Sequence, residues 1–245
     1  MLNQVQYDKK IMEKDIFGKA LLDYQLGNYS EDIITWTNIS DKDELPLPYL
    51  FRDYSEMPKL ERKALQLTKG KVLDVGCGSG SHALYLQEKG FEVKAIDISQ
   101  GAIKVAKQRG VLDTECISLL DYSEEQFDTI LLLMNGTGIF QEVQQVASYL
   151  KHLKSLLKPN GQLLIDSSDI KYMYEDEDGG RWLNLSGRYY GELDYYLSYK
   201  GEEETPMKWL YLDFEMLKTA CLTVGLNCEK VMHGEHFDYL VRIKK

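Results

Sequence analysis

From position 71 onward the sequence repeats one pattern: a short apolar run, a turn, and a segment whose apolar residues recur every three or four positions. Short, continuously apolar runs are typical of strands covered on both faces, and the segments between them have the period of amphipathic helices. Strands that alternate with helices predict a parallel sheet with helices on both sides. The predicted strands cover residues 71–75, 92–97, 115–119, 128–134 and 162–166.

Helix boundaries follow from capping residues and glycines. The first helix is expected to begin at Ser79 or Ser81 and to end before Gly90, and the second to run from residue 99 to 110. The longest, residues 141–158, carries apolar residues at three- and four-residue spacing and stops at a Pro-Asn-Gly sequence.

The two flanks of this region have a different character. Residues 1–60 show short helical patterns and predict an N-terminal helical cap on a main domain of residues 61–245. Tyrosines alternate with polar residues over 189–199, which predicts an antiparallel strand with a partner at 206–211, inside an insertion of about 171–211 that can cover a substrate. Asp213 is expected to cap a further helix, and two closing strands are expected at 227–232 and 237–243.

The stretch VLDVGCGSGSHALYL, residues 72–86, joins a strand, a glycine turn and a helix. Gly76, Gly78 and Gly80 let the backbone turn tightly and approach a ligand without an intervening Cβ. In doubly wound sheets, ligands lie across the carboxyl ends of the strands. A dinucleotide fingerprint would place its third glycine where this chain has Ser81, so the spacing fits a dinucleotide poorly.

Carboxylates stand at the ends of three successive predicted strands. Asp74 would repel a pyrophosphate but attract a cationic ligand. Asp97 lies about 21 residues after the first glycine, where it can accept hydrogen bonds from both hydroxyls of a ribose. Asp121 can accept from the exocyclic amine of an adenine, with Leu119 and Leu120 beside the ring. The three acids therefore predict a positively charged ligand that contains adenosine.

Taken in order, LDVGCGSG, AIDIS, LLDYS, FDTILLLMNG and LLKPNGQLLID resemble the motif series of class I S-adenosylmethionine (SAM)-dependent methyltransferases. The resemblance is close over residues 71–166 and looser over 213–243. It implies an α/β fold, a three-layer Rossmann-like sandwich whose seven-stranded sheet is mostly parallel with an antiparallel last strand. It also implies SAM as the cofactor. In that family the first motif holds the methionine part, the second acid holds the ribose and the third acid meets the adenine.

The resemblance and the positions above give an expected set of cofactor-binding residues. It consists of Asp74, Gly76, Cys77, Gly78, Gly80, Asp97, Ile98, Leu120, Asp121, Met134 and Asn135. Cys77 is expected to contribute its backbone only, because no base or cation near it activates the thiol. Asn135 and Tyr54 are the candidates for a catalytic role. Asn135 follows the fourth strand, where this family often places groups near the substrate or the methyl, and Tyr54 and Arg52 are candidates for closing over the methionine end. His233 and His236 are expected in a turn between strands and not at a metal.

Composition narrows the partners. Lysine and arginine number 29 against 39 acidic residues, a formal charge of −10, which disfavours nucleic acid. No apolar run approaches the roughly 20 residues that span a bilayer, so a cytoplasmic protein without a membrane partner is expected. The four cysteines lack metal-type spacing and are expected to remain thiols.

The predicted activity is transfer of a methyl group to an O, N or S atom of a small-molecule acceptor, in a chain that can form a homodimer. Two alternatives remain open at this stage. One is an NAD(P)-dependent oxidoreductase, and the other is a SAM-binding regulatory protein without transfer activity. The tyrosine-rich strand is either an aromatic wall for a planar or cationic substrate or a strand that packs on the sheet edge.

Overall fold

The computed structural model describes residues 14–174 and 187–245. Within these residues seven strands form one sheet in the order β11-β12-β7-β6-β3-β4-β5. The strands are β3 (Val72–Val75), β4 (Val93–Asp97), β5 (Asp113–Cys116), β6 (Phe127–Leu132), β7 (Leu157–Ser168), β11 (Asn227–His233) and β12 (Asp238–Lys244). Neighbouring strands from β7 to β5 are parallel, whereas β12 is antiparallel to β7 and to β11. The predicted mostly parallel sheet with an antiparallel last strand is confirmed.

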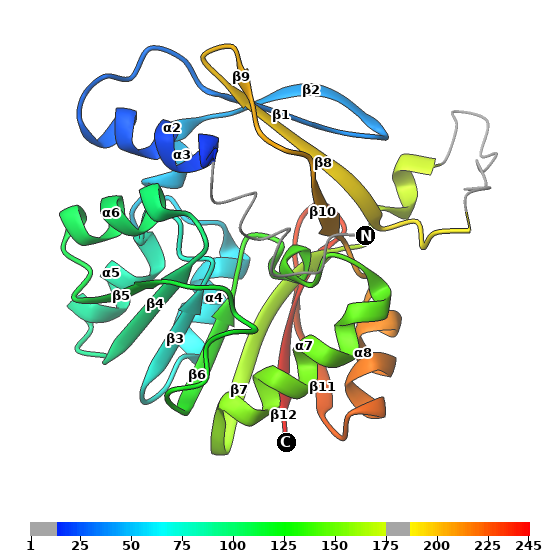
Figure 1. The fold of residues 1–245 in the computed structure, drawn as a ribbon. Helices are drawn as coiled ribbons and strands as arrows, with labels where there is room; N and C mark the ends of the chain where they lie inside the picture. Colours follow the sequence, from blue (N-terminus) through cyan, green and yellow to red (C-terminus); the bar gives the residue numbers. More distant parts are fainter. Residues whose placement is uncertain (1–13, 175–186) are drawn as a thin grey trace.

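Helices cover both faces of this sheet (Figure 1). They are α4 (Lys59–Leu67), α5 (Ser81–Glu88), α6 (Gln100–Arg109), α7 (Val143–Leu156) and α8 (Phe214–Thr223). One apolar core lies between the sheet and α7 and α8, and includes Leu150 and Leu217. The other lies between the sheet and α4, α5 and α6, and includes Ala64 and Ile103. Two cores on opposite faces of one sheet make the three-layer sandwich that the sequence predicted.

Capping explains most of the helix ends. The Ser99 hydroxyl accepts from the amide of Ala102, and α6 ends at Gly110 with φ of 107°, as predicted. Asp213 caps α8 as predicted. The helix α5 begins at Ser81 and ends before Gly90, as predicted. The capping role expected of Ser79 or Ser81 is wrong, because the cap is Gly80 and both serine hydroxyls donate to the carbonyl of Leu50.

A second sheet lies over the carboxyl ends of the parallel strands (Figure 1). Its strands are β1 (Ile33–Thr37), β2 (Ser40–Leu45), β8 (Glu192–Tyr199), β9 (Glu202–Glu203) and β10 (Met207–Leu210), in the order β10-β8-β1-β2 with β9 beside β8. The helices α2 (Ile16–Gln25) and α3 (Leu47–Leu50) adjoin it, and α2 packs on α6. Short 3-10 helices η1 (Gly136–Phe140) and η2 (Ile170–Tyr174) follow β6 and β7.

The hairpin β1–β2 was not predicted, because residues 1–60 were expected to be helical. In the described part of that segment α2 and α3 are helices, but residues 33–45 are mostly strand. The strand β1 pairs with β8, which lies about 160 residues further along the chain, with Thr35 opposite Leu197 and Thr37 opposite Tyr195. The residues of β1, IITWT, favour strands, but nothing local in the sequence indicates their distant partner β8.

Two further boundaries differ from prediction. The strand expected at 115–119 lies at Asp113–Cys116, because β5 pairs only with β4 and ends opposite Asp97. The strand expected at 162–166 begins at Leu157, where it pairs with Phe127, so α7 ends at Leu156. None of the helices among the described residues is long and apolar enough to cross a membrane.

Candidate functional site

The glycine turn follows β3 and has a left-handed backbone at each glycine. The φ angles are 71° at Gly76, 54° at Gly78 and 85° at Gly80, a region that side chains other than glycine rarely adopt. A Cβ at Gly80 would lie 2.7 Å from a methyl of Val111, so α5 and α6 approach closely there. A Cβ at Gly78 would meet nothing within 4 Å, so the backbone at this turn faces open space.

Asp97, at the end of β4, links two of the loops that form the site. Its carboxylate accepts from the amide of Gly78 at 2.9 Å and from the amide of Ser99 at 2.9 Å. Burial raises its pKa to about 6 against the effect of these two amides. Because a carboxylate has about four acceptor positions, capacity remains for two ligand hydroxyls.

Asp74 is buried inside the end of β3, with 2% of its surface exposed. Burial raises the pKa of this carboxyl, while the charge of His82 and the amide of Ala83 act in the opposite direction. Its Oδ2 has no hydrogen-bond partner among the described residues. A buried, unsatisfied carboxylate oxygen is costly unless a donor or cation reaches it, and the positively charged methionyl part of SAM is such a group.

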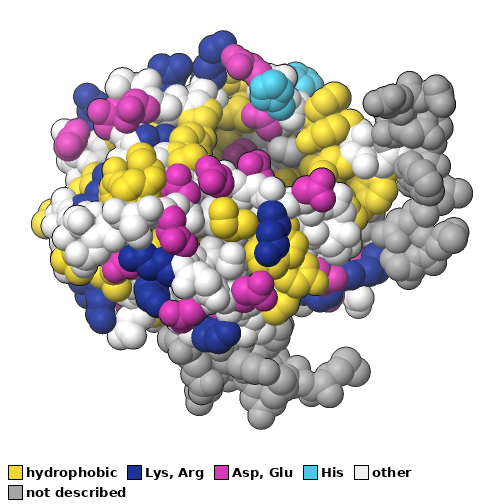
Figure 2. Space-filling model, turned by 90° about the horizontal axis from the view of Figure 1, so that it is seen from above, with side chains coloured by type: hydrophobic (Ala, Val, Ile, Leu, Met, Phe, Trp, Pro, Cys, Tyr) yellow, Lys and Arg dark blue, Asp and Glu magenta, His cyan; other side chains and the backbone are white. Residues whose placement is uncertain are grey.

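A cavity opens where these loops meet the second sheet. Its lining consists of Val75, Gly76, Ile96, Asp97, Ile98, Ile117, Ser118, Leu119, Gly138, Ile139, Gln141, Tyr149, Met207, Lys208 and Trp209. Gly76, Asp97 and Ile98 are therefore brought together as predicted, whereas Leu120 and Asp121 lie in the turn that follows the cavity wall. Seen from above, the molecule has a hollow with hydrophobic and acidic side chains around it (Figure 2).

The strand β10 forms the roof of this cavity. Trp209 packs against Gly138 so closely that a Cβ there would lie 2.2 Å from the indole ring. Met207 and Lys208, the two residues before Trp209 in β10, also line the cavity. The second sheet thus forms part of the wall of the site.

Met134 and Asn135 follow β6 with φ of 66° and 59°. Left-handed backbone at two consecutive residues other than glycine is strained, and such strain concentrates at functional sites. The side chain of Asn135 accepts from the hydroxyl of Ser167 at 3.2 Å and donates to the carbonyl of Leu210 at 3.4 Å. It therefore connects the end of β6 to β7 and to the second sheet.

Two predicted positions have surroundings that do not favour a direct role. The ring of Tyr54 stacks on Tyr85 of α5 with centroids 4.1 Å apart, and its hydroxyl accepts from Gln66. The thiol of Cys77 is buried, and burial raises its pKa well above the usual value. A protonated thiol is a weak nucleophile, which agrees with the expectation that Cys77 contributes only backbone.

A buried ion-pair network lies beside Asp74, and no sequence pattern indicated that its members meet. Both carboxylate oxygens of Glu61 lie 2.5 Å from the guanidinium of Arg52, and one lies 2.7 Å from Nε2 of His82. Burial opposes the charge of Glu61, but His82 and Arg52 outweigh it and lower its pKa. Burial likewise opposes the cation of His82, but Glu61 and Asp74 raise its pKa. The network holds the start of α5 against α4.

Asp166 is a further acid at the site that no sequence motif indicated. It lies near the carboxyl end of β7 and accepts from the amide of Gly136 at 3.0 Å and from the amide of Asn135. Burial raises its pKa to about 6, against the effect of those amides. The only signal in the sequence was its place at the end of a predicted strand.

Comparisons with known proteins agree with this architecture. A family model described as a methyltransferase domain matches residues 49–212. The SAM-dependent methyltransferase from Bacteroides fragilis, solved with S-adenosyl-L-homocysteine, is 42% identical and has a TM-score of 0.88, with 95% of each chain covered. The sugar N-methyltransferase KedS8 from Streptoalloteichus is 15% identical with a TM-score of 0.54 over 76% of this chain and 85% of that one, a likeness of fold alone.

Curated relatives give the same family. An uncharacterized methyltransferase of Staphylococcus carnosus is 29% identical over 80% of this chain and 87% of that protein. The putative methyltransferase YqeM of Bacillus subtilis is 32% identical over 40% of this chain, and the chain spans only 42% of its length. These matches favour methyl transfer over the dinucleotide alternative. With a family model that spans most of the chain and a solved SAM-dependent relative that matches nearly all of it, the chain belongs to the SAM-dependent methyltransferases with a Rossmann-like fold.

Proposed function

We propose that the protein transfers the methyl group of SAM to an O, N or S atom of a small molecule that binds between the two sheets. The observation that carries this proposal is the composition of the cavity wall. The residues of one side, Gly76 and Asp97, come from the parallel sheet, and those of the other, Met207 and Trp209, come from the second sheet. A cavity enclosed in this way suits a small acceptor better than a macromolecule.

The proposed cofactor contacts follow the geometry of the loops. Asp97 accepts from the ribose hydroxyls, and Ile98, Leu120 and Asp121 adjoin the adenine. Asp74 faces the positively charged methionyl part of SAM, since its Oδ2 is buried without a partner among the described residues.

The other proposed cofactor contacts belong to backbone at the ends of β3 and β6. The glycine turn, with the backbone of Cys77, gives the ligand close access to the main chain. Met134 and Asn135 lie at the end of β6, beside the strand that carries the glycine turn, and adjoin the methyl-bearing end.

SAM supplies an electrophilic methyl on a sulfonium with a neutral leaving group. The protein therefore needs to orient the two reactants and to exclude water more than to activate either one. Trp209 and Met207 exclude water from above, and the anchored loops after β3, β4 and β6 fix the positions of the contacts. The acidic carboxylates near the site favour a neutral or cationic acceptor.

Calorimetric titration with SAM and with NADH tests the cofactor half of the proposal. The expected result is binding of SAM at micromolar concentration and none of NADH. Incubation with methyl-labelled SAM and pooled metabolites, followed by mass spectrometry, tests transfer. Binding of SAM without a labelled product in any pool would favour the alternative of a non-catalytic SAM-binding protein.

A further inference from the structure

Asp166 lies at the same edge of the sheet as the proposed cofactor site, two strands beyond β3. The cavity that contains Asp97 lies over β3, β4 and β5, and the sheet continues from β3 through β6 to β7. A ligand with its adenosyl part over β4 and its methionyl part over β3 directs its remaining face toward β6 and β7. Asp166 stands near the end of β7, beside the loop that carries Asn135.

The backbone around Asp166 is built to hold this carboxylate in place. The left-handed conformations of Met134 and Asn135 turn the chain so that two consecutive amides, those of Asn135 and Gly136, donate to it. Two amides use about half of the acceptor positions of a carboxylate. The side chain is therefore fixed and still able to accept hydrogen bonds from a ligand.

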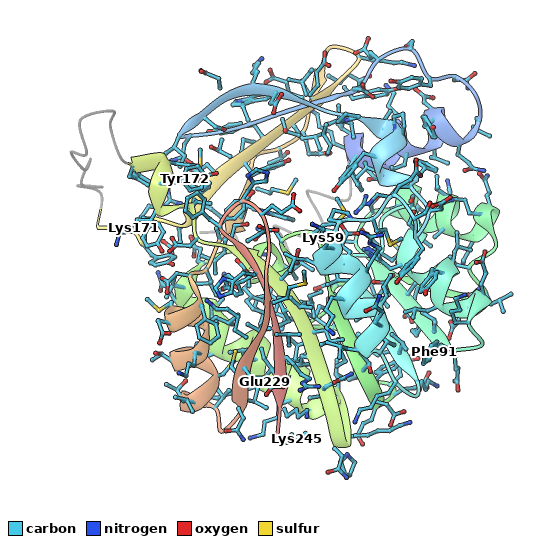
Figure 3. The ribbon with its side chains drawn as sticks, turned by 180° about the vertical axis from the view of Figure 1, so that it is seen from behind. Lys59, Phe91, Lys171, Tyr172, Glu229 and Lys245 are labelled. Carbon is cyan, nitrogen blue, oxygen red and sulfur yellow. The ribbon has the colours of Figure 1, made fainter. Side chains whose placement is uncertain are left out.

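Two tyrosines lie close enough to Asp166 to respond to its charge. Burial first, and then the charge of Asp166, raise the pKa of Tyr49 in α3 and of Tyr211, just after β10. Tyr211 in turn interacts with Tyr172 of η2 and Tyr195 of β8. Tyr172 lies at the edge of the gap between the two sheets, seen from behind (Figure 3).

A second cavity adjoins the same tyrosines. Tyr195 and Tyr211 line it together with Thr35, Trp36 and the hairpin residues that follow. Aromatic faces attract cations, and their bodies provide apolar area for a small molecule. Tyr211, which lies near Asp166, is thus also part of an aromatic cavity wall, and Asp41, Lys42 and Asp43 belong to the polar part of the same lining.

Among the described residues, no cation forms an ion pair with Asp166. Arg52 is committed to both oxygens of Glu61, and the imidazole of His82 to the same carboxylate. Although His82 lowers the pKa of Asp166 and Glu61 raises it, neither forms a direct bond with it in the structure. A donor that carries positive charge is therefore the complementary partner for this acid.

We propose that Asp166 binds the nucleophilic nitrogen of the acceptor and that the acceptor is a small amine with an apolar or aromatic body. This inference rests on the proposed function, since it places the amine at the methyl end of SAM. An amine that binds as the ammonium first loses one proton to water by way of Asp166. An N–H of the resulting free amine donates to the carboxylate, which directs the nitrogen lone pair toward the methyl carbon.

The transfer moves charge toward Asp166. The nitrogen lone pair forms the new N–CH3 bond, and the S–CH3 bond breaks with its electron pair remaining on sulfur. The positive charge moves from the sulfonium to the nitrogen, next to the carboxylate, and one N–H proton then passes to Asp166 and on to water. A fixed negative charge at the point where positive charge develops stabilises the transition state.

The test compares Asp166→Asn with Asp128→Asn as a matched control. Asparagine keeps an oxygen for the amides at position 166 but presents an NH2 group to an amine. Asp128 also accepts from a backbone amide, that of Lys71, and lies where β6 begins, opposite the end that holds the site. Each protein is loaded with S-adenosyl-L-homocysteine and titrated with pairs of aromatic amines and alcohols of equal shape, beginning with benzylamine and benzyl alcohol. Transfer from methyl-labelled SAM to pooled amines, alcohols and thiols is measured in parallel.

The expected results are preference for the amine and loss of that preference in one variant only. Amines bind the wild-type protein and Asp128→Asn about 10-fold or more tightly than the matched alcohols, and Asp166→Asn removes the difference. N-methyl products fall by about 10- to 100-fold in Asp166→Asn, while its affinity for SAM stays within about threefold. Equal binding of amine and alcohol, O- or S-methyl products, or N-methylation that survives in Asp166→Asn overturns the inference. Failure of the wild-type protein to bind SAM is a different result and overturns the proposed function itself.

Discussion

Replacement of Asp97 by asparagine should remove most of the affinity for SAM without unfolding the protein. The carboxylate is anchored by amides of Gly78 and Ser99, each at 2.9 Å, and asparagine keeps one oxygen for such a bond. Two ribose hydroxyls then lose their ionised acceptor. Hydrogen bonds to charged groups contribute about 1.5–3 kcal/mol each. A total loss of about 3 kcal/mol corresponds to a dissociation constant about 100-fold higher.

The pH dependence of binding gives an independent check of the same contact. Because burial raises the pKa of Asp97 to about 6, the free protein binds a proton there in mild acid. The proton competes with the ribose hydroxyls, so affinity for SAM should be constant above about pH 7 and fall by up to about tenfold per pH unit below 6. The free energy of unfolding should change in the opposite direction. A carboxyl whose pKa is raised on folding stabilises the folded state in acid, and this contribution is lost as the pH rises through 6.

Titration calorimetry over pH 5 to 8 measures the affinity for SAM, and scanning calorimetry over the same range measures the stability. Asp113→Asn is the control, because Asp113 begins β5, pairs with Lys94 and does not line the cavity. The control should bind SAM as the wild-type protein does. Asp97 does not hold the ribose if Asp97→Asn binds SAM within threefold of wild type, or if this variant still loses affinity for SAM in acid.

Three further predictions concern the framework of the site. Glu61→Ala leaves Arg52 and His82 buried without their partner and should lower the free energy of unfolding in urea by about 3–5 kcal/mol. Glu229→Ala is the control, because it breaks a partly exposed pair with Arg242 and should cost less than about 1 kcal/mol. A Glu61→Ala loss as small as that of Glu229→Ala would contradict the role of the network. Gly80→Ala places a Cβ 2.7 Å from a methyl of Val111 at a φ of 85°, so it should destabilise the protein by about 1–3 kcal/mol and weaken SAM binding. An unchanged melting temperature would contradict the close approach at Gly80. Asp213→Ala removes the cap of α8 and should cost about 1–2 kcal/mol in the same urea assay, while calorimetry should find SAM affinity unchanged.

The parallel sheet and the cofactor turn could be predicted because their signals are local. Short apolar runs, glycines with obligatory left-handed backbone, and the capping residues Ser99 and Asp213 each act within a few residues of the chain. The same holds for Asp97, whose distance from the glycine turn is set by one strand and one helix. Positions of this kind follow from periodicity and spacing alone.

The second sheet, the network around Glu61 and the environment of Asp166 required the tertiary structure. The strand β1 pairs with the distant strand β8, and Glu61 acquires its partners Arg52 and His82 from two other segments. The sequence by itself determined where the glycine turn lies and that Asp74 and Asp97 stand at the ends of parallel strands, because backbone conformation and hydrogen bonding to near neighbours decide those features. Only the tertiary structure decided which side chains close over the cofactor cavity and which acid lies among the tyrosines, because burial and long-range pairing, and with them charge and pKa, arise when distant segments meet.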